Sequence, residues 1–155
     1  MKEGYCCFTG HRDILPEDRA RINCQLDSVI HSLIERGVHC FISGAAIGFD
    51  MLAAQAVLRA KRAAPAIRLF LALPCTDQDA KWSAAQRRTY QQLLSAADAY
   101  RYISPVPYYN GCMQHRNRYM VDHSGYVVVY LRRMRGGTFQ TVNYARQQQV
   151  QCIYL

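Results

Sequence analysis

The chain has 155 residues, half of them hydrophobic and 19% charged, which is typical of one globular domain that needs no disulfides or metals for its core. The formal net charge is +8, and ten of the 19 basic residues but only three of the 11 acidic ones lie within residues 78–155. A nucleic-acid partner is compatible with this charge, but no lysine-rich tract or basic amphipathic helix favours one.

The first residues and the cysteines indicate the compartment. No apolar run is long enough for a membrane span, and the amino-terminal segment lacks the pattern of a secretory signal, so we expect a cytoplasmic location without membrane contact. Seven cysteines, an odd number without a C-x-x-C pair, argue against a disulfide framework and a zinc site. We therefore expect reduced cysteines and no metal.

Short apolar segments alternate along the chain with segments of helical periodicity. Glycine and proline mark many of the boundaries; Pro16, for example, opens the first helix and Gly37 ends it. In chain order we predict strand 5–8, helix 16–36, strand 38–42, helix 49–63, strand 67–73, helix 81–97, strand 99–103, helix 112–123, strand 126–131, a helix from residue 136, and a last candidate strand, 150–155.

This order predicts a Rossmann-like α/β fold. Strands that alternate with helices form parallel sheets, and the strands here are continuous apolar runs, as expected for strands covered on both faces. We therefore expect a three-layer α/β/α architecture with a mainly parallel sheet of about five or six strands. No linker-like stretch divides the chain, so residues 1–155 are predicted to form a single domain.

Glycines and polar residues follow three of the predicted strands, in residues 9–12, 43–50 and 132–138. Ligands of parallel α/β sheets bind outside the carboxyl ends of the strands, so these segments are expected at one edge. Residues 44–48 and 136–138 each precede a helix, whose free N–H groups favour phosphate. The hydroxyls expected to add hydrogen bonds are those of Thr9, Ser43, Thr138 and Thr141.

Asp50 lies in the first turn of its predicted helix, where two interpretations remain. It either caps the helix and favours its dipole, or it accepts hydrogen bonds from the ribose hydroxyls or base of a ligand. His11 and His115 titrate near neutral pH but have no evident partner by spacing, so we interpret them as polar contacts.

The segment 108–122 is dense in polar side chains for a helix and the loop before it. Gln114, Arg118 and Asp122 share one helical face by their spacing, and Arg116 lies off that face. Each arginine is equally well explained as a solvated surface residue or as a ligand contact. The tyrosines at 108 and 109 either stack on a base or cover the edge of the core.

Four motifs in this order resemble the YpsA-like branch of the SLOG superfamily: Thr9-Gly10-His11-Arg12, Ser43-Gly44-Ala45-x-x-Gly48-Phe49-Asp50, Arg116-Asn117-Arg118-Tyr119-Met120-Val121-Asp122 and Gly136-Gly137-Thr138-x-x-Thr141. The superfamily includes the DprA/Smf DNA-processing proteins and the LOG phosphoribohydrolases. The resemblance covers nearly the whole chain. It implies a Rossmann-like fold that binds a nucleotide or nucleotide-derived ligand at the glycine-marked edge, and many members look like sensors of such ligands.

The LOG enzymes, which cleave the N-glycosidic bond of nucleoside monophosphates, provide a sharper comparison. Those enzymes use an arginine on the helix before the glycine loop, and Arg116 lies at a similar distance before that loop. The resemblance therefore implies a catalytic role for Arg116. The Pro-Gly-Gly-x-Gly-Thr-x-x-Glu pattern of those enzymes is only partly met: Arg135 replaces the proline, and Asn143 and Tyr144 stand where the glutamate is expected. No acidic residue follows Asp122, so the carboxylate of those enzymes is missing unless Asp50 or Asp122 substitutes for it. Binding without turnover is therefore the preferred interpretation.

Three functions remain as hypotheses. The first is binding or sensing of a ligand such as ADP-ribose, NAD or a nucleoside monophosphate, with no required cofactor. The second is hydrolysis of a nucleoside 5′-monophosphate through Arg116, and the third is single-stranded DNA binding. The alanine-rich helix at 53–64 could also pair with a second copy. The predicted ligand-binding residues are Thr9, Gly10, His11, Arg12, Ser43, Gly44, Ala45, Gly48, Asp50, Arg116, Arg118, Gly136, Gly137, Thr138 and Thr141.

Overall fold

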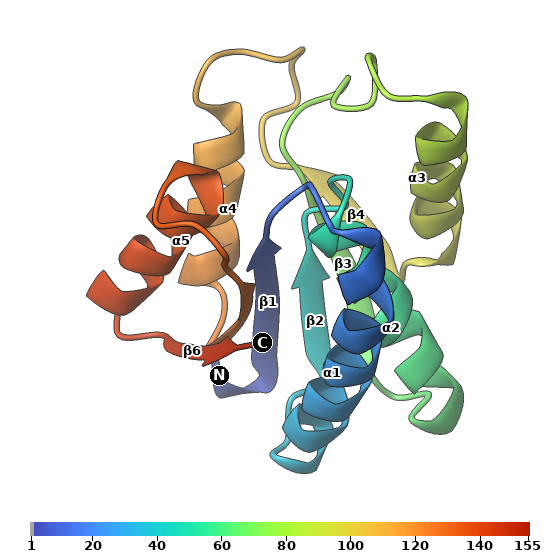
Figure 1. Ribbon diagram of the computed structural model, residues 1–155, viewed down its shortest axis with the longest axis vertical. Coiled ribbons are helices and arrows are strands. Elements are labelled where there is room, and N and C mark those ends of the chain that lie inside the picture. Colours follow the sequence, from blue (N-terminus) through green and yellow to red (C-terminus); the bar gives the residue numbers. More distant parts are fainter. Residues whose placement is uncertain (1) are drawn as a thin grey trace.

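The computed structural model describes residues 2–155, in which six strands alternate with five α-helices after a short 3-10 helix at Lys2–Gly4 (Figure 1). The elements are β1 (Tyr5–Gly10), α1 (Pro16–Glu35), β2 (Cys40–Ser43), α2 (Phe49–Ala63), β3 (Arg68–Leu73), α3 (Ala84–Ala96), β4 (Ala99–Tyr102), α4 (Cys112–Asp122), β5 (Tyr126–Tyr130), α5 (Gly136–Gln147) and β6 (Gln151–Tyr154). The predicted Rossmann-like α/β fold is confirmed, including its last strand.

The six strands form one parallel sheet in the order β4-β3-β2-β1-β5-β6. The chain builds the sheet outward from β1 to β4 and then returns to place β5 on the other side of β1. Such a reversal of strand order leaves a crevice between the carboxyl ends of the two strands that flank it. The topology therefore directs a ligand site to the ends of β1 and β5.

Helices cover both faces of the sheet, α1, α2 and α3 on one face and α4 and α5 on the other (Figure 1). Neighbouring residues of β1 point to opposite sides: Phe8 packs into the first layer and Cys7 into the second. Both sides of the strand are fully buried, which explains why β1 reads as a continuous apolar run rather than an alternating one.

The alanine-rich segment of α2 packs into the hydrophobic core. Ala53, Ala54 and Ala56 are completely buried and let the helix pack closely in the first layer. These three side chains are therefore not accessible to a second copy. No helix within residues 2–155 is both long and apolar enough to cross a lipid bilayer.

One helix begins later than predicted. Residues expected to open α3 form turns, and the helix starts at Ala84 because Ser83 caps it. The Ser83 hydroxyl accepts from Gln86 N at 3.2 Å, and Gln86 Oε1 accepts from Ser83 N at 2.9 Å. This reciprocal capping box satisfies two backbone N–H groups and fixes the boundary.

Candidate functional site

A cleft of about 680 Å³ lies at the carboxyl ends of β1 and β5, where the strand order reverses. The loops after β1 and β5, the start of α5 and one side of α4 contribute to its walls. Nine of the fifteen predicted site residues line it: Thr9, Gly10, His11, Arg12, Asp50, Arg116, Gly136, Gly137 and Thr138. Segments predicted to meet at one edge of the sheet thus do meet there.

The other six predicted residues lie outside this lining. Arg118 and Thr141 line a groove of about 320 Å³ between α4 and α5, which shares Asn117 and Gly137 with the cleft. Gly48 lines a depression between α1, α2 and α3, which shares Arg12 and Asp13 with the cleft. The remaining three, Ser43, Gly44 and Ala45, lie among the fully buried or nearly fully buried residues behind the cleft.

The amino terminus of α5 opens into the cleft. No side chain caps it, so the N–H groups of its first turn have no partner within the helix. Gly136 has a φ of +88°, which favours glycine, and a Cβ at Gly137 would meet no atom within 4 Å. The first turn therefore presents N–H donors and the positive end of the helix dipole to open space.

A buried cluster of Arg116, Asp50 and Gly44 forms the floor of the site. Arg116 is 3% exposed, and its Nη1 donates to the carbonyls of Gly44 at 2.9 Å and of Ala72 at 3.1 Å. Burial raises the pKa of Asp50, and the positive charge of Arg116 opposes that rise. Arg116 thus joins the ends of β2 and β3 to α4, so this side chain has a structural role.

Gly44 is required by this cluster rather than by an approach from the cleft. A Cβ at residue 44 would lie 2.4 Å from Arg116 Nη1 and 2.7 Å from Asp50 Oδ2. Both distances are too short for any side chain, so glycine leaves room for the guanidinium and the carboxylate. The sequence indicated that another group comes close to the backbone at Gly44. In the structure that group is protein, namely the side chains of Arg116 and Asp50, and not a ligand.

The loop 44–48, predicted to cradle phosphate, directs two of its N–H groups to protein acceptors. Ala45 N donates to Ser43 Oγ at 3.2 Å, and Ala46 N donates to Asp50 Oδ2 at 3.4 Å. Phe49 N, at the start of α2, donates to the carbonyl of His11 at 3.1 Å. This loop supports the cleft from behind, and α5 supplies the open helix terminus.

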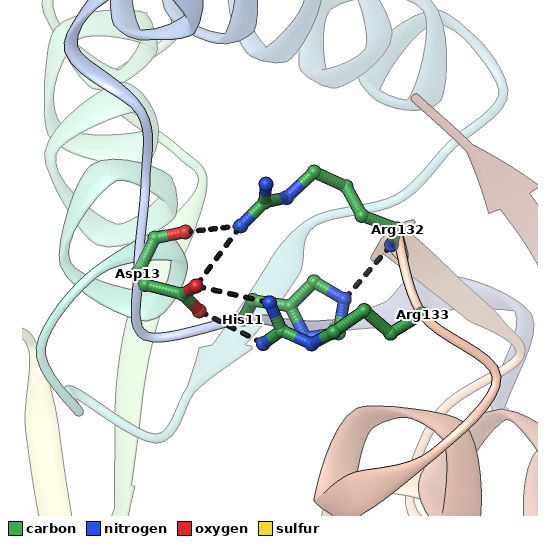
Figure 2. A network of polar contacts seen from close by, with 4 residues as sticks. All are labelled: His11, Asp13, Arg132 and Arg133. Atoms are coloured by element: carbon green, nitrogen blue, oxygen red, sulfur yellow. Dashed lines mark hydrogen bonds and ion pairs between the residues drawn. The ribbon is translucent and has the colours of Figure 1, made fainter.

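An ionic network closes one side of the cleft by joining the loop after β1 to the loop after β5 (Figure 2). The Asp13 carboxylate accepts from Arg133 through both oxygens, each at 2.9 Å, and from Arg132 Nη2 at 3.1 Å. Asp13 and Arg133 both line the cleft, although the motifs did not single them out. The feature of the sequence that could have identified them is their position shortly after the ends of β1 and β5, at the edge where a ligand is expected.

His11 has a partner that its spacing could not reveal, because 121 residues separate the two groups. Its Nε2 accepts from Arg132 N at 2.8 Å, so this nitrogen carries no proton in the structure. His11 is 5% exposed, and burial lowers its pKa below 6.5, aided by the charges of Arg133 and Arg132 and opposed by Asp13. Neutral His11 thus holds the loop after β5.

We expect His11→Gln to reduce the pH dependence of stability. The folded state holds the His11 proton less tightly than the unfolded state, so stability is present above the unfolded pKa and is lost as the pH falls toward the lower folded pKa. Glutamine retains an acceptor for Arg132 N without this titration. Urea unfolding between about pH 7.5 and about pH 5.5 should show a smaller loss of stability than in the unsubstituted protein.

The control for this experiment is His31→Gln, which replaces an exposed histidine on the outer side of α1 that is paired with Glu35. Its unfolding should follow the same pH dependence as the unsubstituted protein. An unchanged slope in His11→Gln would show that neutral His11 does not stabilise the loop.

Comparison with known proteins places the chain in a family. The YpsA family model, described as the YspA SLOG family, matches residues 8–154. The "Uncharacterized SPbeta prophage-derived protein YoqJ" of Bacillus subtilis is 32% identical over 82% of this chain and 81% of its own length. A UPF0398 protein of Halalkalibacterium halodurans is also 32% identical, over 79% of this chain and 66% of its own length.

Two solved structures share the fold. DNA processing protein A from Helicobacter pylori, reported for its single-stranded DNA binding mode, has a TM-score of 0.69 at 18% identity and covers 99% of this chain. The Streptococcus pneumoniae DprA structure has a TM-score of 0.68 at 16% identity and covers 97%. The match spans 65% and 49% of those two chains, respectively. The fold, the order of the site segments and the family match agree, and the chain therefore belongs to the YpsA family of SLOG proteins.

Proposed function

We propose that this protein binds a phosphate-bearing, nucleotide-type ligand in the cleft and does not turn it over. The observation that carries this proposal is the uncapped amino terminus of α5, which lines the cleft at the reversal of strand order. Backbone N–H groups and a helix dipole directed at open space are a recurrent site for phosphate.

The charges around the cleft support an anionic ligand. Four arginines and two aspartates line it, and neither aspartate offers a free negative charge to the space. Asp13 is paired with two arginines, and Asp50 is buried beside Arg116. Within residues 2–155, Arg12 and Arg135 form no ion pair, so both are available to a phosphate.

An aromatic side chain at the rim supports a nucleoside beside the phosphate. Tyr108 is 59% exposed and lines the cleft, and its backbone N–H is fixed by Asp77 Oδ1 at 2.7 Å. An exposed ring at the rim of a polar cleft provides a stacking surface for a base. The amide of Asn117 lies in the same lining and can donate to the sugar or base.

The positions of the carboxyl groups support binding without turnover. At the positions where the LOG resemblance expects a glutamate, Asn143 is exposed, and Tyr144 donates its hydroxyl to Asp122 at 2.6 Å in the outer groove. Arg116 is held by two backbone carbonyls behind the cleft. Release of free base from AMP by the purified protein would overturn this part of the proposal.

The test of binding is Gly137→Ala. Residue 137 is in the first turn of α5, and a methyl group there meets no protein atom, so the fold should be as stable as before. The methyl group instead enters the space proposed for the phosphate. Calorimetric titration with AMP, cyclic AMP, ADP-ribose and NAD should show at least one ligand, whose Kd increases about tenfold or more in the variant.

Two arginines of the same helix region provide a charge-matched comparison. Arg135→Gln removes a cation from the cleft, whereas Arg146→Gln removes one from the last turn of α5, outside the lining. Only the first should weaken binding. No binding by any phosphate-bearing ligand, or equal binding by Gly137→Ala and the unsubstituted protein, would contradict the proposal.

Single-stranded DNA is the second candidate ligand, favoured by the fold shared with the Helicobacter DNA processing protein and by the net charge of +8. Such binding tracks the phosphate backbone and weakens steeply with salt. Titration of a labelled thymidine oligonucleotide of about 20 nucleotides distinguishes the two. Tight, salt-sensitive binding that free nucleotides do not displace would favour DNA over a small ligand.

A further inference from the structure

The pair of Arg133 and Asp13 has the geometry by which arginine holds a free anion. Arg133 Nη1 lies 2.9 Å from Asp13 Oδ2, and Nη2 lies 2.9 Å from Oδ1, so the two planar groups meet at two points (Figure 2). Carboxylate and phosphate fit this fork equally well. Because both residues line the cleft, the fork is within reach of a bound ligand.

This pair is also one that a ligand can exchange. The side chains of Arg133 and Asp13 are 37% and 63% exposed, and ion pairs in such surroundings contribute little net stability. A phosphate carries more negative charge than a carboxylate and presents more acceptor oxygens. It therefore competes well for the same guanidinium.

Release of Arg133 would not leave Asp13 alone or free the loop. Arg132 Nη2 donates both to the Asp13 carbonyl, at 2.9 Å, and to its carboxylate, at 3.1 Å. Arg132 N is held separately by His11 Nε2 at 2.8 Å. One arginine thus anchors the loop after β5, while its neighbour contributes a fork that can change partner.

We infer that Arg133 is a second anion subsite of the cleft, held by Asp13 in the absence of ligand, and that the ligand carries two phosphoryl groups. The inference rests on the proposed function and specifies its ligand class. One phosphoryl group lies at Gly136 and Gly137, and the other takes the Arg133 fork from Asp13. A nucleoside diphosphate or a molecule with a diphosphate bridge has this chemistry.

Calorimetric titration with AMP and ADP, without divalent cations, tests the inference. The unsubstituted protein should bind ADP more tightly than AMP. Asp13→Asn removes the competing charge but keeps an acceptor for Arg132, so it should tighten ADP binding about three- to tenfold and change AMP binding little. Arg133→Gln should reduce ADP affinity to the level of AMP.

Asp27 and Arg59 form the matched control pair. Arg59 Nε and Nη2 donate to Asp27 Oδ1 at 3.1 and 2.9 Å, and both residues lie on α1 and α2 outside the cleft lining. Asp27→Asn and Arg59→Gln change the net charge by the same amounts as the cleft variants. Neither should alter the ratio of the AMP and ADP affinities, and thermal unfolding verifies that every variant is folded.

The outcomes separate the two proposals. If the unsubstituted protein binds AMP and ADP equally and Arg133→Gln changes neither, the diphosphate inference fails while the proposed function stands. Weaker ADP binding in Asp13→Asn, or an effect no larger than that of Asp27→Asn, also overturns it. If no phosphate-bearing ligand binds at all, the proposed function fails first, and the inference fails with it.

Discussion

Replacement of Arg116 by methionine is expected to lower the free energy of unfolding by about 3–5 kcal/mol. Methionine fills much of the space but removes the bonds that Arg116 donates to the carbonyls of Gly44 and Ala72, so that Gly44 keeps only its donor Gln78 Nε2 at 3.3 Å. It also leaves Asp50, which is 8% exposed, without its cationic neighbour in a buried place. Urea unfolding followed by circular dichroism measures the loss.

Two further variants make this prediction specific to the buried cluster. Arg118→Met lies on the same helix two residues away, exposed and stacked over Tyr144 at 5.2 Å, and should change stability by no more than about 1 kcal/mol. Adding Asp50→Asn to Arg116→Met should recover part of the loss, because the uncompensated charge is removed. Equal unfolding midpoints for Arg116→Met and Arg118→Met would refute the buried role.

The Arg116 result also affects how enzymatic experiments are read. Arg116→Ala is the obvious substitution for testing the hydrolase hypothesis, since the resemblance assigns the catalytic role to this residue. In this fold the substitution removes a structural guanidinium that joins β2, β3 and α4. Loss of activity or binding in Arg116→Ala would therefore not distinguish a missing catalytic group from an unfolded protein. The folded fraction must be measured in the same sample.

Gly48→Ala is expected to cost about 3 kcal/mol or more, through backbone strain and a steric clash together. Gly48 has a φ of +85°, and a Cβ there would lie 2.2 Å from the carbonyl oxygen of Arg12. The obstacle is backbone rather than a movable side chain, so the loop after β1 would have to shift. Because that loop carries Asp13, the ionic network at the cleft should loosen too.

Gly37→Ala provides a comparison at a positive φ without the steric clash. Gly37 has a similar φ of +98°, but no atom lies within 4 Å of the position of its Cβ. Its substitution therefore measures strain alone and should cost about 1 kcal/mol. The additional loss in Gly48→Ala combines the steric clash with the strain of its ψ of −126°, and equal thermal unfolding of the two variants would show that the loop after β1 does not constrain residue 48.

The fold could be predicted from the sequence because its signals are local. A strand buried on both faces, such as β5, reads as an unbroken apolar run, and Pro16 and Gly37 delimit α1 closely. The parallel order then places every strand-following segment at one edge. Eight of the nine predicted residues in the cleft belong to such segments, and the ninth, Arg116, lies on α4.

The remaining part of the site depends on contacts between distant segments. The bond between His11 and Arg132 spans 121 residues, and no local pattern encodes it. Helical spacing correctly set Arg116 apart from Arg118, but it could not show that Arg116 points to the ends of β2 and β3. At Gly44 and Gly48 the sequence indicated close approach, yet only the structure shows that protein atoms approach them.

The position of β1 between β2 and β5 has a consequence for the order in which the cleft forms during synthesis. β1 pairs with β2, about one helix away in sequence, but its other neighbour, β5, begins at residue 126. A nascent chain can assemble the first four strands while one side of β1 still lacks its partner. The cleft is complete only when β5 and α5 have emerged, so the proposed ligand would bind only after β1 has been joined to segments more than 100 residues away, and it would favour the completed fold over partly folded intermediates.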